Sequence, residues 1–284
     1  MLCLVLLLLA ALGVGAVWGN RSLQVQEVAV DCPGLPAAFQ GFRLAQVSDL
    51  HNATFGRDNA RLLAALAQAK PEIILLTGDL ADSRRTHLSV ALSFARQAAA
   101  IAPVYYVPGN HEARLAQYAA FAAALEAAGV QVLANRAVPL VRGSPGGSPS
   151  PGWPTPALPR GPGTPARQRP SWGTPWRPFA CPARPFPLLL AHRPEWFPLY
   201  AEGGAALVFS GHAHGGQVRL PGIGGLFAPG QGLFPRYNGG LYRRGQAQMV
   251  VSRGLGNSLF PLRVGNRPEV VVATLHPAPS VEGQ

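Results

Sequence analysis

The stretch FRLAQVSDLH at residues 42–51 decides the fold class of this chain. Its apolar first half has the length of a buried β-strand, and Asp49 and His51 follow that strand directly. Two later apolar runs end in the same way, one before Gly78-Asp79 and the other before Gly109-Asn110-His111. Because helical patterns separate these runs, the sequence predicts parallel β-α-β units with polar residues at the strand ends.

Apolar periodicity predicts the other elements around these motifs. Strands are expected at residues 42–47, 73–76, 104–107, 130–133, 188–190, 207–210, 248–252 and 269–275. Helices are expected at residues 59–68, 88–100 and 113–128. This alternation of strands and helices is typical of an α/β domain.

Three histidines in the second half of the chain complete the set of candidate ligands: His192, His212 and His214. The carboxyl ends of parallel strands meet at one edge of a sheet, so residues distant in sequence converge there. Five of the 7 histidines lie within these motifs, which scattered structural histidines would not do. The motifs therefore predict a metal site at the strand ends.

The candidate ligands combine carboxylate, amide and imidazole groups, which suit Mn, Fe, Zn or Co better than Ca. No thiolate belongs to the set, so it does not describe a structural zinc site. One Asp carboxylate can bridge two ions, and water between two ions ionises near neutral pH. A remaining histidine can then protonate the leaving alkoxide. Three charged neighbours, Asp82, Glu112 and Arg193, are expected around the ligands or at the surface rather than on a metal.

Each motif taken alone has an ordinary structural explanation. Asp49 could cap a turn, and Asn110 could be a turn residue. His192 could simply end a strand, while His212 and His214 could lie on alternate faces of one. The metal site is favoured because all these explanations would have to hold together, in one order along the chain.

The composition narrows the classes of function. The 284 residues are 48% hydrophobic, enough for a sizeable core, and the formal net charge is +11. Lys70 is the single lysine, so the charge reflects arginine, from either a GC-rich genome or an anion-attracting surface. No dense basic run with interleaved aromatic residues occurs, which makes nucleic-acid binding unlikely. The cysteines Cys3, Cys32 and Cys181 match no zinc or disulfide framework, and free thiols are favoured over a Cys32–Cys181 bridge.

Residues 1–20 are expected to form an N-terminal membrane anchor or a signal segment. The apolar run has a length at the lower edge of a membrane span. No Lys or Arg precedes it, which is unusual for a secretory signal and favours an uncleaved anchor. We therefore expect the protein at the cell membrane, held by a single N-terminal span. Arg21 alone argues only weakly for a cytoplasmic domain, so the side of the membrane stays open.

The segment 143–187 interrupts the alternation of strands and helices. It is rich in Pro, Gly and Arg, contains no acidic residue and shows neither helix nor strand period. Such composition indicates either a disordered insertion or a frame-shifted replacement of ordinary sequence. It divides the expected domain into two halves, residues 21–142 and residues 188–276. A C-terminal tail at residues 277–284 follows the second half.

The motifs together resemble the calcineurin-like metallophosphoesterases. The resemblance is carried by SDLH at 48–51, GDLAD at 78–82, GNHE at 109–112, LAHRP at 190–194 and GHAHGGQ at 211–217. It extends to a membrane-associated bacterial branch of the family, through residues 35–51 and 215–269. The implied fold is an α/β sandwich of two mixed β-sheets flanked by helices. The segment 143–187 departs from the family pattern, where core strands and an Asp-rich segment are expected.

The resemblance also implies roles for the motif residues. One ion would be held by Asp49, His51, Asp79 and His214. The other would be held by Asp79, Asn110, His192 and His212, with Asp79 bridging. His111 would face the leaving group as the catalytic histidine.

The function expected from residues and resemblance is hydrolysis of a phosphodiester or phosphomonoester by a hydroxide that bridges two divalent ions, manganese being one candidate. The substrate would be a phosphorylated small molecule or a lipid, such as a lipid-linked or nucleotide-sugar-lipid compound. The glycine-rich residues 222–233 either line a lipid-facing edge or form an ordinary loop. The alternatives are a nucleic-acid or nucleotide phosphodiesterase, and a non-catalytic membrane protein with a compromised fold.

Overall fold

Strand β2 (Arg43–Val47) lies inside a six-stranded mixed sheet in the computed structural model, which describes residue 15 and residues 18–133, 137–140, 153–156, 186–258 and 260–279. The strand order is β1 (Gln24–Pro33), β16 (Glu269–Ala278), β2, β3 (Ile73–Leu76), β4 (Val104–Tyr106) and β5 (Val130–Val132). Strands β2 to β5 are parallel, whereas β16 runs antiparallel to β2 and parallel to β1.

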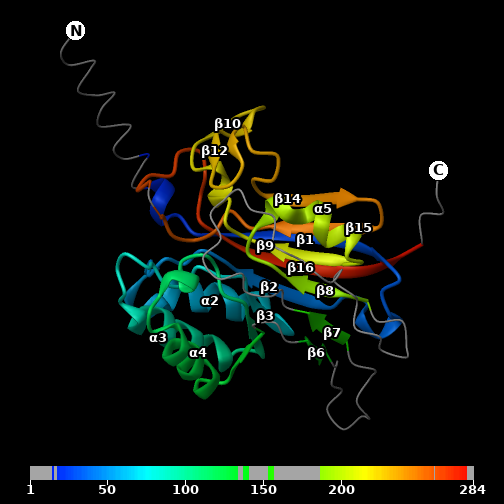
Figure 1. Cartoon of the computed structure of the whole chain (residues 1–284), viewed down its shortest axis with the longest axis horizontal. Coiled ribbons are helices and arrows are strands. Elements are labelled where there is room, and N and C mark those ends of the chain that lie inside the picture. Colours follow the sequence, from blue (N-terminus) through cyan, green and yellow to red (C-terminus); the bar gives the residue numbers. More distant parts are fainter. Residues whose placement is uncertain are drawn as a thin grey trace.

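A second, four-stranded mixed sheet packs against the first (Figure 1). Its order is β14 (Gly240–Arg244), β15 (Ala247–Val251), β9 (Leu207–Ser210) and β8 (Leu188–Leu190). Strands β15, β9 and β8 are parallel, and β14 is antiparallel to β15. The expected sandwich of two mixed sheets is therefore confirmed.

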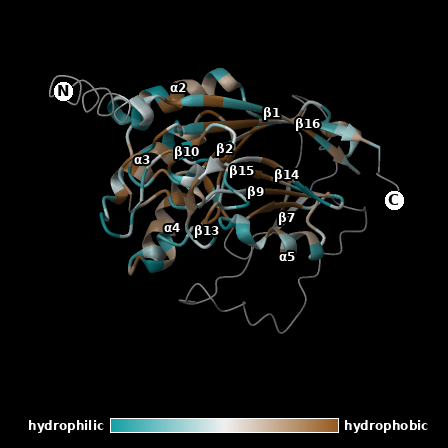
Figure 2. Cartoon of the chain, turned by 90° about the horizontal axis from the view of Figure 1, so that it is seen from above, coloured by the Kyte–Doolittle hydropathy of each residue, from teal (hydrophilic) through white to brown (hydrophobic). Residues whose placement is uncertain are grey.

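The core between the sheets explains why the strands read as continuous apolar runs. In β3, Ile73 and Leu75 face the other sheet, while Ile74 and Leu76 face the helices. Both faces of the strand are buried, so an alternating polar pattern is absent. From the second sheet, Leu190 and other apolar residues close the same inter-sheet core. Figure 2 shows hydrophobic residues concentrated in the central strands, with hydrophilic residues on the outer helices and loops.

Helices cover the outer face of each sheet (Figure 1). The six-stranded sheet is covered by α2 (Ala60–Ala69), α3 (Leu88–Ala99) and α4 (Tyr118–Ala127). The four-stranded sheet is covered by α5 (Phe197–Glu202). Short 3-10 turns occur at η1 (Ala37–Phe39), η2 (Arg57–Asn59), η3 (Glu112–Arg114), η4 (Pro194–Trp196) and η5 (His214–Gly216).

The structure corrects three expectations about elements. The helix predicted at 113–128 begins only at Tyr118, because the chain first makes the separate turn η3. Strands β1 and β14 were not expected; β1 is an edge strand with mostly exposed or half-buried residues, so its sequence lacks a clear apolar run. Two further small hairpins, β10–β11 (Arg219–Leu220, Gly224–Gly225) and β12–β13 (Phe227–Ala228, Gly232–Leu233), lie beyond β9.

The Pro-rich segment contributes one short strand that its sequence period did not predict. Strand β7 (Trp153–Pro156) pairs antiparallel with β6 (Ala137–Leu140). The rest of the segment, up to residue 185, lies outside the described residues, as do Cys3 and Cys181. The same holds for most of the expected anchor at 1–20. Within the described ranges, no helix has both the length and the apolar character needed to cross a membrane.

Candidate metal centre

The candidate ligands lie where strands of both sheets end. In the six-stranded sheet, Asp49 follows β2, Asp79 follows β3 and Asn110 follows β4, and the last residues of these three strands are in register. In the four-stranded sheet, His192 follows β8 and His212 follows β9. The packing of the two sheets brings these loops together at one edge of the sandwich, as parallel strand ends allow.

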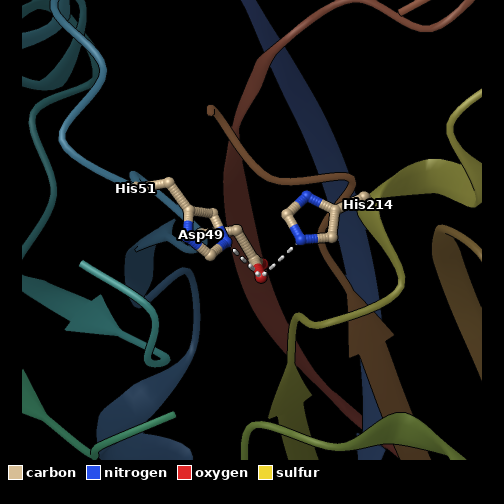
Figure 3. A group of neighbouring side chains, drawn as sticks. All are labelled: Asp49, His51 and His214. Carbon is tan, nitrogen blue, oxygen red and sulfur yellow. Dashed lines mark ion pairs between the residues drawn. The ribbon is translucent and has the colours of Figure 1, made fainter. Parts of the chain in front are cut away.

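One group of side chains gathers around the Asp49 carboxylate (Figure 3). Its Oδ1 atom lies 3.5 Å from Nε2 of His214 and 3.9 Å from Nε2 of His51. All three residues are buried, with at most 4% of any of them exposed. Asp49 and His51 come from the loop after β2 and His214 comes from the loop after β9, so the group joins the two sheets.

A second group consists of Asp79, His192 and His212. Oδ2 of Asp79 lies 3.1 Å from Nε2 of His192. The same oxygen lies 3.7 Å from Nε2 of His51, which belongs to the first group. Asp79 therefore stands between the two groups, where a bridging carboxylate would have to be.

The unsatisfied polar atoms of the described residues fit bound cations. Buried atoms without a hydrogen-bond partner include both ring nitrogens of His51, Nε2 of His192, Nε2 of His212 and Oδ1 of Asn110. Leaving a buried polar atom unsatisfied costs about 1–3 kcal/mol each. Each of these side chains can offer one lone pair, and beside two buried carboxylates they make up the donor set of divalent ions such as Mn, Fe, Zn or Co.

The protonation of the histidines suits the same role. Burial lowers the pKa of His51 to about 3, and burial with the nearby His192 holds the pKa of His212 well below its ordinary value. Neutral imidazoles keep the lone pair that a metal ligand needs. His192 differs, because the Asp79 carboxylate outweighs the effect of burial and raises its pKa to about 10. The Asp79–His192 contact thus marks a position at which positive charge is stabilised.

The backbone of the ligand loops is strained. Asp49, His51, Asp79, His212 and His214 all have φ between 46° and 66°, the left-handed region that is uncommon for residues other than glycine, although Asp and His enter it more often than most. Residues held in sparsely populated backbone regions concentrate at functional sites, where the surrounding structure enforces them. The strain therefore supports a functional rather than a purely structural role for these loops.

Two glycines matter for close approach to the carboxylates. A Cβ atom on Gly211 would collide with Oγ of Ser48 and Oδ2 of Asp49. A Cβ atom on Gly109 would collide with Oδ1 of Asp79. Gly109 has no positive φ, so its lack of a side chain matters for this close contact rather than for the backbone conformation.

Glu112 holds the loop that carries Asp79. Its carboxylate accepts hydrogen bonds from the backbone N–H groups of Asp79 and Gly109, both at 2.8 Å, and of Ala81 at 2.9 Å. The residue is completely buried, and burial together with the Asp79 charge raises its pKa to about 7. It lies behind the candidate ligands, as the sequence suggested.

His111 lies beside these two groups and belongs, with His51 and Asp82, to a third cluster of potential ligand atoms. Its Nδ1 accepts a hydrogen bond from the Ser83 backbone N–H at 3.1 Å and lies 3.3 Å from Oδ1 of Asp82. Its Nε2 lies 3.2 Å from Oγ of Ser258. The ring of His51 packs edge-on against it, with ring centroids 4.6 Å apart. His111 is thus close to the candidate ligands while its nitrogens contact other residues.

Sequence reasoning missed the support that comes from the C-terminal part of the chain. Arg263 is completely buried and donates hydrogen bonds to the backbone oxygens of Arg253 and Gly256. Asn266 donates to the backbone oxygen of His214 at 2.7 Å. Composition does not reveal that Arg263 is buried, and the contact of Asn266 joins residues far apart in the sequence. Arg193 instead pairs with Glu195 at 3.1 Å, outside the ligand groups.

A cavity of about 470 Å³ opens beside this centre. Its wall includes His51, the arginines Arg84 and Arg85, and Ser258. The volume falls within the range of small-molecule sites, roughly 300–1,000 Å³. It offers space for a substrate next to the candidate ligands.

Comparison with known proteins identifies the family. A profile of the calcineurin-like phosphoesterases matches residues 42–216. The metallophosphoesterase YkuE of Bacillus subtilis is 28% identical over 259 residues, which cover 89% of this chain and 85% of YkuE. The phosphodiesterase YaeI of Escherichia coli is 29% identical and covers 82% of both chains. A protein of Danio rerio named a transmembrane protein with metallophosphoesterase domain is 27% identical over 97% of this chain and 62% of its own length. With that profile spanning more than half of its residues, the chain belongs to the calcineurin-like phosphoesterase family and is a metal-dependent phosphoesterase.

Proposed function

We propose that two divalent ions are bound by the residues that converge at the strand ends. Asp49, His51 and His214 would hold one ion, and Asn110, His192 and His212 the other, with the Asp79 carboxylate shared between them. The observation that carries this assignment is the position of Oδ2 of Asp79, 3.7 Å from Nε2 of His51 and 3.1 Å from Nε2 of His192. Manganese is the ion we propose to test first, with Fe, Zn and Co as the other candidates.

The bound ions would supply an ionised water molecule near neutral pH and neutralise the phosphoryl oxygens of the substrate. The chain's own residues hold and orient these groups. The backbone N–H of His212 donates to Oδ2 of Asp49 at 3.0 Å, and the backbone N–H of His111 donates to Oδ1 of Asp79 at 2.8 Å. Each carboxylate is thereby fixed by the loop of a neighbouring ligand, as metal-binding side chains usually require.

His111 is the residue that would protonate the leaving oxygen. As a general acid, His111 would act in its imidazolium form, in which both ring nitrogens carry protons. The Asp82 carboxylate, with Oδ1 at 3.3 Å from Nδ1, would stabilise that charge. Nε2, the nitrogen that faces Ser258, would then carry the proton for the leaving oxygen, and we assign His111 that role.

The test of this function is hydrolysis by the purified full chain in detergent. Bis(4-nitrophenyl) phosphate and 4-nitrophenyl phosphate should be hydrolysed with added Mn²⁺, and a chelator should abolish the activity until Mn²⁺ is restored. A folded protein that hydrolyses neither compound with Mn, Co, Zn or Fe would refute the proposal.

We also propose that the enzyme works at the cell membrane on a lipid-linked phosphate. Beside the expected anchor at residues 1–20, the described residues expose a group of large apolar side chains, here called the apolar face: Trp18, Leu220, Ile223, Phe227, Leu233, Phe234, Phe260, Leu262 and Val264. Soluble proteins rarely expose large contiguous apolar patches unless these bind a partner or a membrane.

Hydrogen bonds join the segments that carry the apolar face. The backbone N–H of Arg219 donates to the backbone oxygen of Val264 at 2.9 Å, and the side chains of Asn20 and Asn257 are hydrogen-bonded. In Figure 1 the hairpins labelled β10 and β12 lie on the same side of the molecule as the first described residues. Residues 203–268 contain seven arginines and no acidic residue, a charge pattern that favours an anionic lipid surface.

Hydrogen exchange of the full chain, compared in detergent and in phosphatidylglycerol vesicles, tests the membrane proposal. The hairpins at residues 219–234 should become protected in vesicles, whereas helix α5, with its exposed Leu199, should not. Equal exchange of both segments in the two conditions would remove the support for a membrane-facing surface. Faster hydrolysis of soluble nucleotides or single-stranded DNA than of phospholipids would favour the alternative, a nucleic-acid or nucleotide phosphodiesterase.

A further inference from the structure

The cavity beside His51 is lined by hydrogen-bond donors of positive charge. Its wall includes Arg84, Arg85, Asn257 and Ser258. Among the residues that the structure describes, no carboxylate belongs to the wall, and the side chain of Asp82, which pairs with Arg84, is completely buried. A wall of this kind is suited to a ligand that brings negative charge of its own, in addition to the phosphate held at the metal centre.

Arg84 is fixed in place by its neighbours. Its Nε and Nη2 atoms donate to the two oxygens of Asp82 at 3.1 and 3.0 Å, which is the paired geometry of an arginine–carboxylate contact. Its Nη2 also donates to Oγ of Ser258 at 3.5 Å, another residue of the wall. The guanidinium therefore contributes fixed positive charge to the wall, and its Asp82 partner links that wall to His111.

Arg85 is held more loosely. Its Nη2 lies 3.7 Å from Oδ2 of Asp82, beyond hydrogen-bond distance, and 68% of its side chain is exposed. Its backbone is anchored, because the Asn52 side chain donates to its carbonyl oxygen. An arginine with an anchored backbone and an accessible guanidinium can bind an anion through two parallel hydrogen bonds.

The size of the cavity fits more than one group. At roughly 30 Å³ for each water molecule in the liquid, about 470 Å³ corresponds to some fifteen waters. A phosphate and the first atoms beyond it fit into such a volume. Because His51 forms part of the wall, the cavity adjoins the candidate metal centre, and a group bound there can belong to the same molecule as a phosphate at that centre.

We propose that this cavity binds a second phosphate of the substrate, joined to the scissile phosphate, and that Arg85 is the residue that recognises it. The inference rests on the proposed function and narrows its substrate class to diphosphate diesters. In such a reaction an oxygen–phosphorus bond forms between water and the scissile phosphorus, and the bond from that phosphorus to the bridging oxygen breaks. The bridging oxygen leaves on the second phosphate, and the products are two phosphomonoesters and two protons.

The kinetic test compares two substrates with the full chain: bis(4-nitrophenyl) phosphate, which has one phosphate, and a dialkyl diphosphate diester. The measured quantity is the ratio of kcat/KM for the diphosphate to kcat/KM for the monophosphate compound. Arg85→Ala should lower this ratio at least about tenfold, the size expected when a hydrogen bond between charged groups is lost. Arg85→Lys should restore part of it, because lysine supplies the charge without the fork.

Arg243→Ala is the matched control. Arg243 is 61% exposed and lies 4.0 Å from an Asp31 oxygen, so it resembles Arg85 in exposure and pairing but lines a different cavity. Its ratio should stay within twofold of the unaltered protein. An Arg85→Ala ratio equal to that of the control would overturn the inference while leaving metal-dependent hydrolysis intact.

A binding measurement decides the matter even if neither compound is hydrolysed, which would sink the proposed function. Inorganic pyrophosphate and inorganic phosphate are titrated into the metal-free full chain by calorimetry. Pyrophosphate should bind more tightly than phosphate, and Arg85→Ala should weaken it at least fivefold while Arg243→Ala does not. Equal affinities for the two anions, or no effect of Arg85→Ala, would show that the cavity is not a diphosphate site.

Discussion

The two sheets contribute different chemistry to the candidate metal centre. The loops of the six-stranded sheet carry both carboxylates, Asp49 and Asp79, whereas the four-stranded sheet contributes only imidazoles, among them His192 and His212. Neither edge alone has the complete proposed donor set. The proposed centre would therefore require the packed inter-sheet core, and metal binding would depend on that packing.

The two edges also differ in what holds them. On the carboxylate edge, Glu112 holds the Asp79 loop from within the same sheet, because it accepts hydrogen bonds from three backbone N–H groups around Asp79 and Gly109. Asp49 is instead held from the other sheet, by the backbone N–H of His212. The histidine edge likewise depends on the other sheet, because Nδ1 of His192 contacts the backbone oxygen of Thr77 at 2.7 Å. A change on the carboxylate edge should therefore also alter the positions of the histidines.

Removing the shared carboxylate should have the largest effect. Asp79→Ala takes away the charge between the two ligand groups, so at least one ion should be lost and activity should fall by far more than 100-fold. Even the removal of a residue that only supports a metal ligand usually lowers metal affinity or activity by about 10–100-fold. Elemental analysis and Mn²⁺-dependent hydrolysis measure both quantities. Asp58→Ala, on an exposed aspartate, should change neither, and retention of two ions by Asp79→Ala would contradict the shared-ligand assignment.

Removing His111 should lower the rate without emptying the centre. His111→Ala should reduce kcat by about 10²–10⁴-fold, the usual contribution of general acid–base catalysis. The metal content should stay that of the unaltered protein, because the nitrogens of His111 contact Ser83 and Ser258. A variant that loses metal as Asp79→Ala does would make His111 a ligand instead of a catalyst.

The carboxylate edge was also the easier half to predict from sequence. Its ligands directly follow short apolar strands, so Asp49 and Asp79 could be placed at strand ends from local pattern alone. The predicted strand at 73–76 agrees with β3 residue for residue. The tertiary contacts between the ligands were not readable in this way, because they depend on how the two sheets pack.

What the sequence could not show lies in tertiary contacts. Asn266 donates to the backbone oxygen of His214, which is far from it in the sequence, and no local period marks this contact. Strand β1 pairs along ten residues with β16, but most of its residues are exposed or half-buried, so its sequence lacks the apolar pattern of a buried strand. Helix α4 starts late because η3 carries Glu112 inward to the backbone of the Asp79 loop, a tertiary demand that helix propensity does not contain.

A core substitution between the sheets should disturb metal binding more than one of equal size elsewhere. Phe209 in β9 is fully buried between the sheets, and Phe94 in α3 is fully buried on the outer face of the six-stranded sheet. Each change to alanine should cost about 3–5 kcal/mol of unfolding free energy. Only Phe209→Ala should also weaken Mn²⁺ affinity, measured by metal titration of the folded variants. Equal affinities would show that the two edges do not depend on their mutual packing.

The smallest expected effect is on the support of the carboxylate edge itself. Glu112→Gln keeps the shape of the side chain but has only one acceptor oxygen. The Glu112 carboxylate has two, which accept hydrogen bonds from three backbone N–H groups. The loss should be about 1–3 kcal/mol, the cost of buried donors left without partners. Urea unfolding of the metal-free protein measures it. A loss within error of zero would mean that the loop is held by other contacts.

The pH dependence of the stability difference between Glu112→Gln and the unaltered protein gives a further test. The folded-state pKa of Glu112 is raised to about 7 from an ordinary value of 4.5, so its contribution is fully present below pH 4.5 and is lost as pH rises through 7. Glutamine does not titrate, so the stability gap between Glu112→Gln and the unaltered metal-free protein should shrink as pH rises from 4.5 to 7. A gap that widens over this window would show that the Glu112 carboxylate is stabilised in its charged form by the three backbone donors, which would then outweigh burial and the neighbouring Asp79.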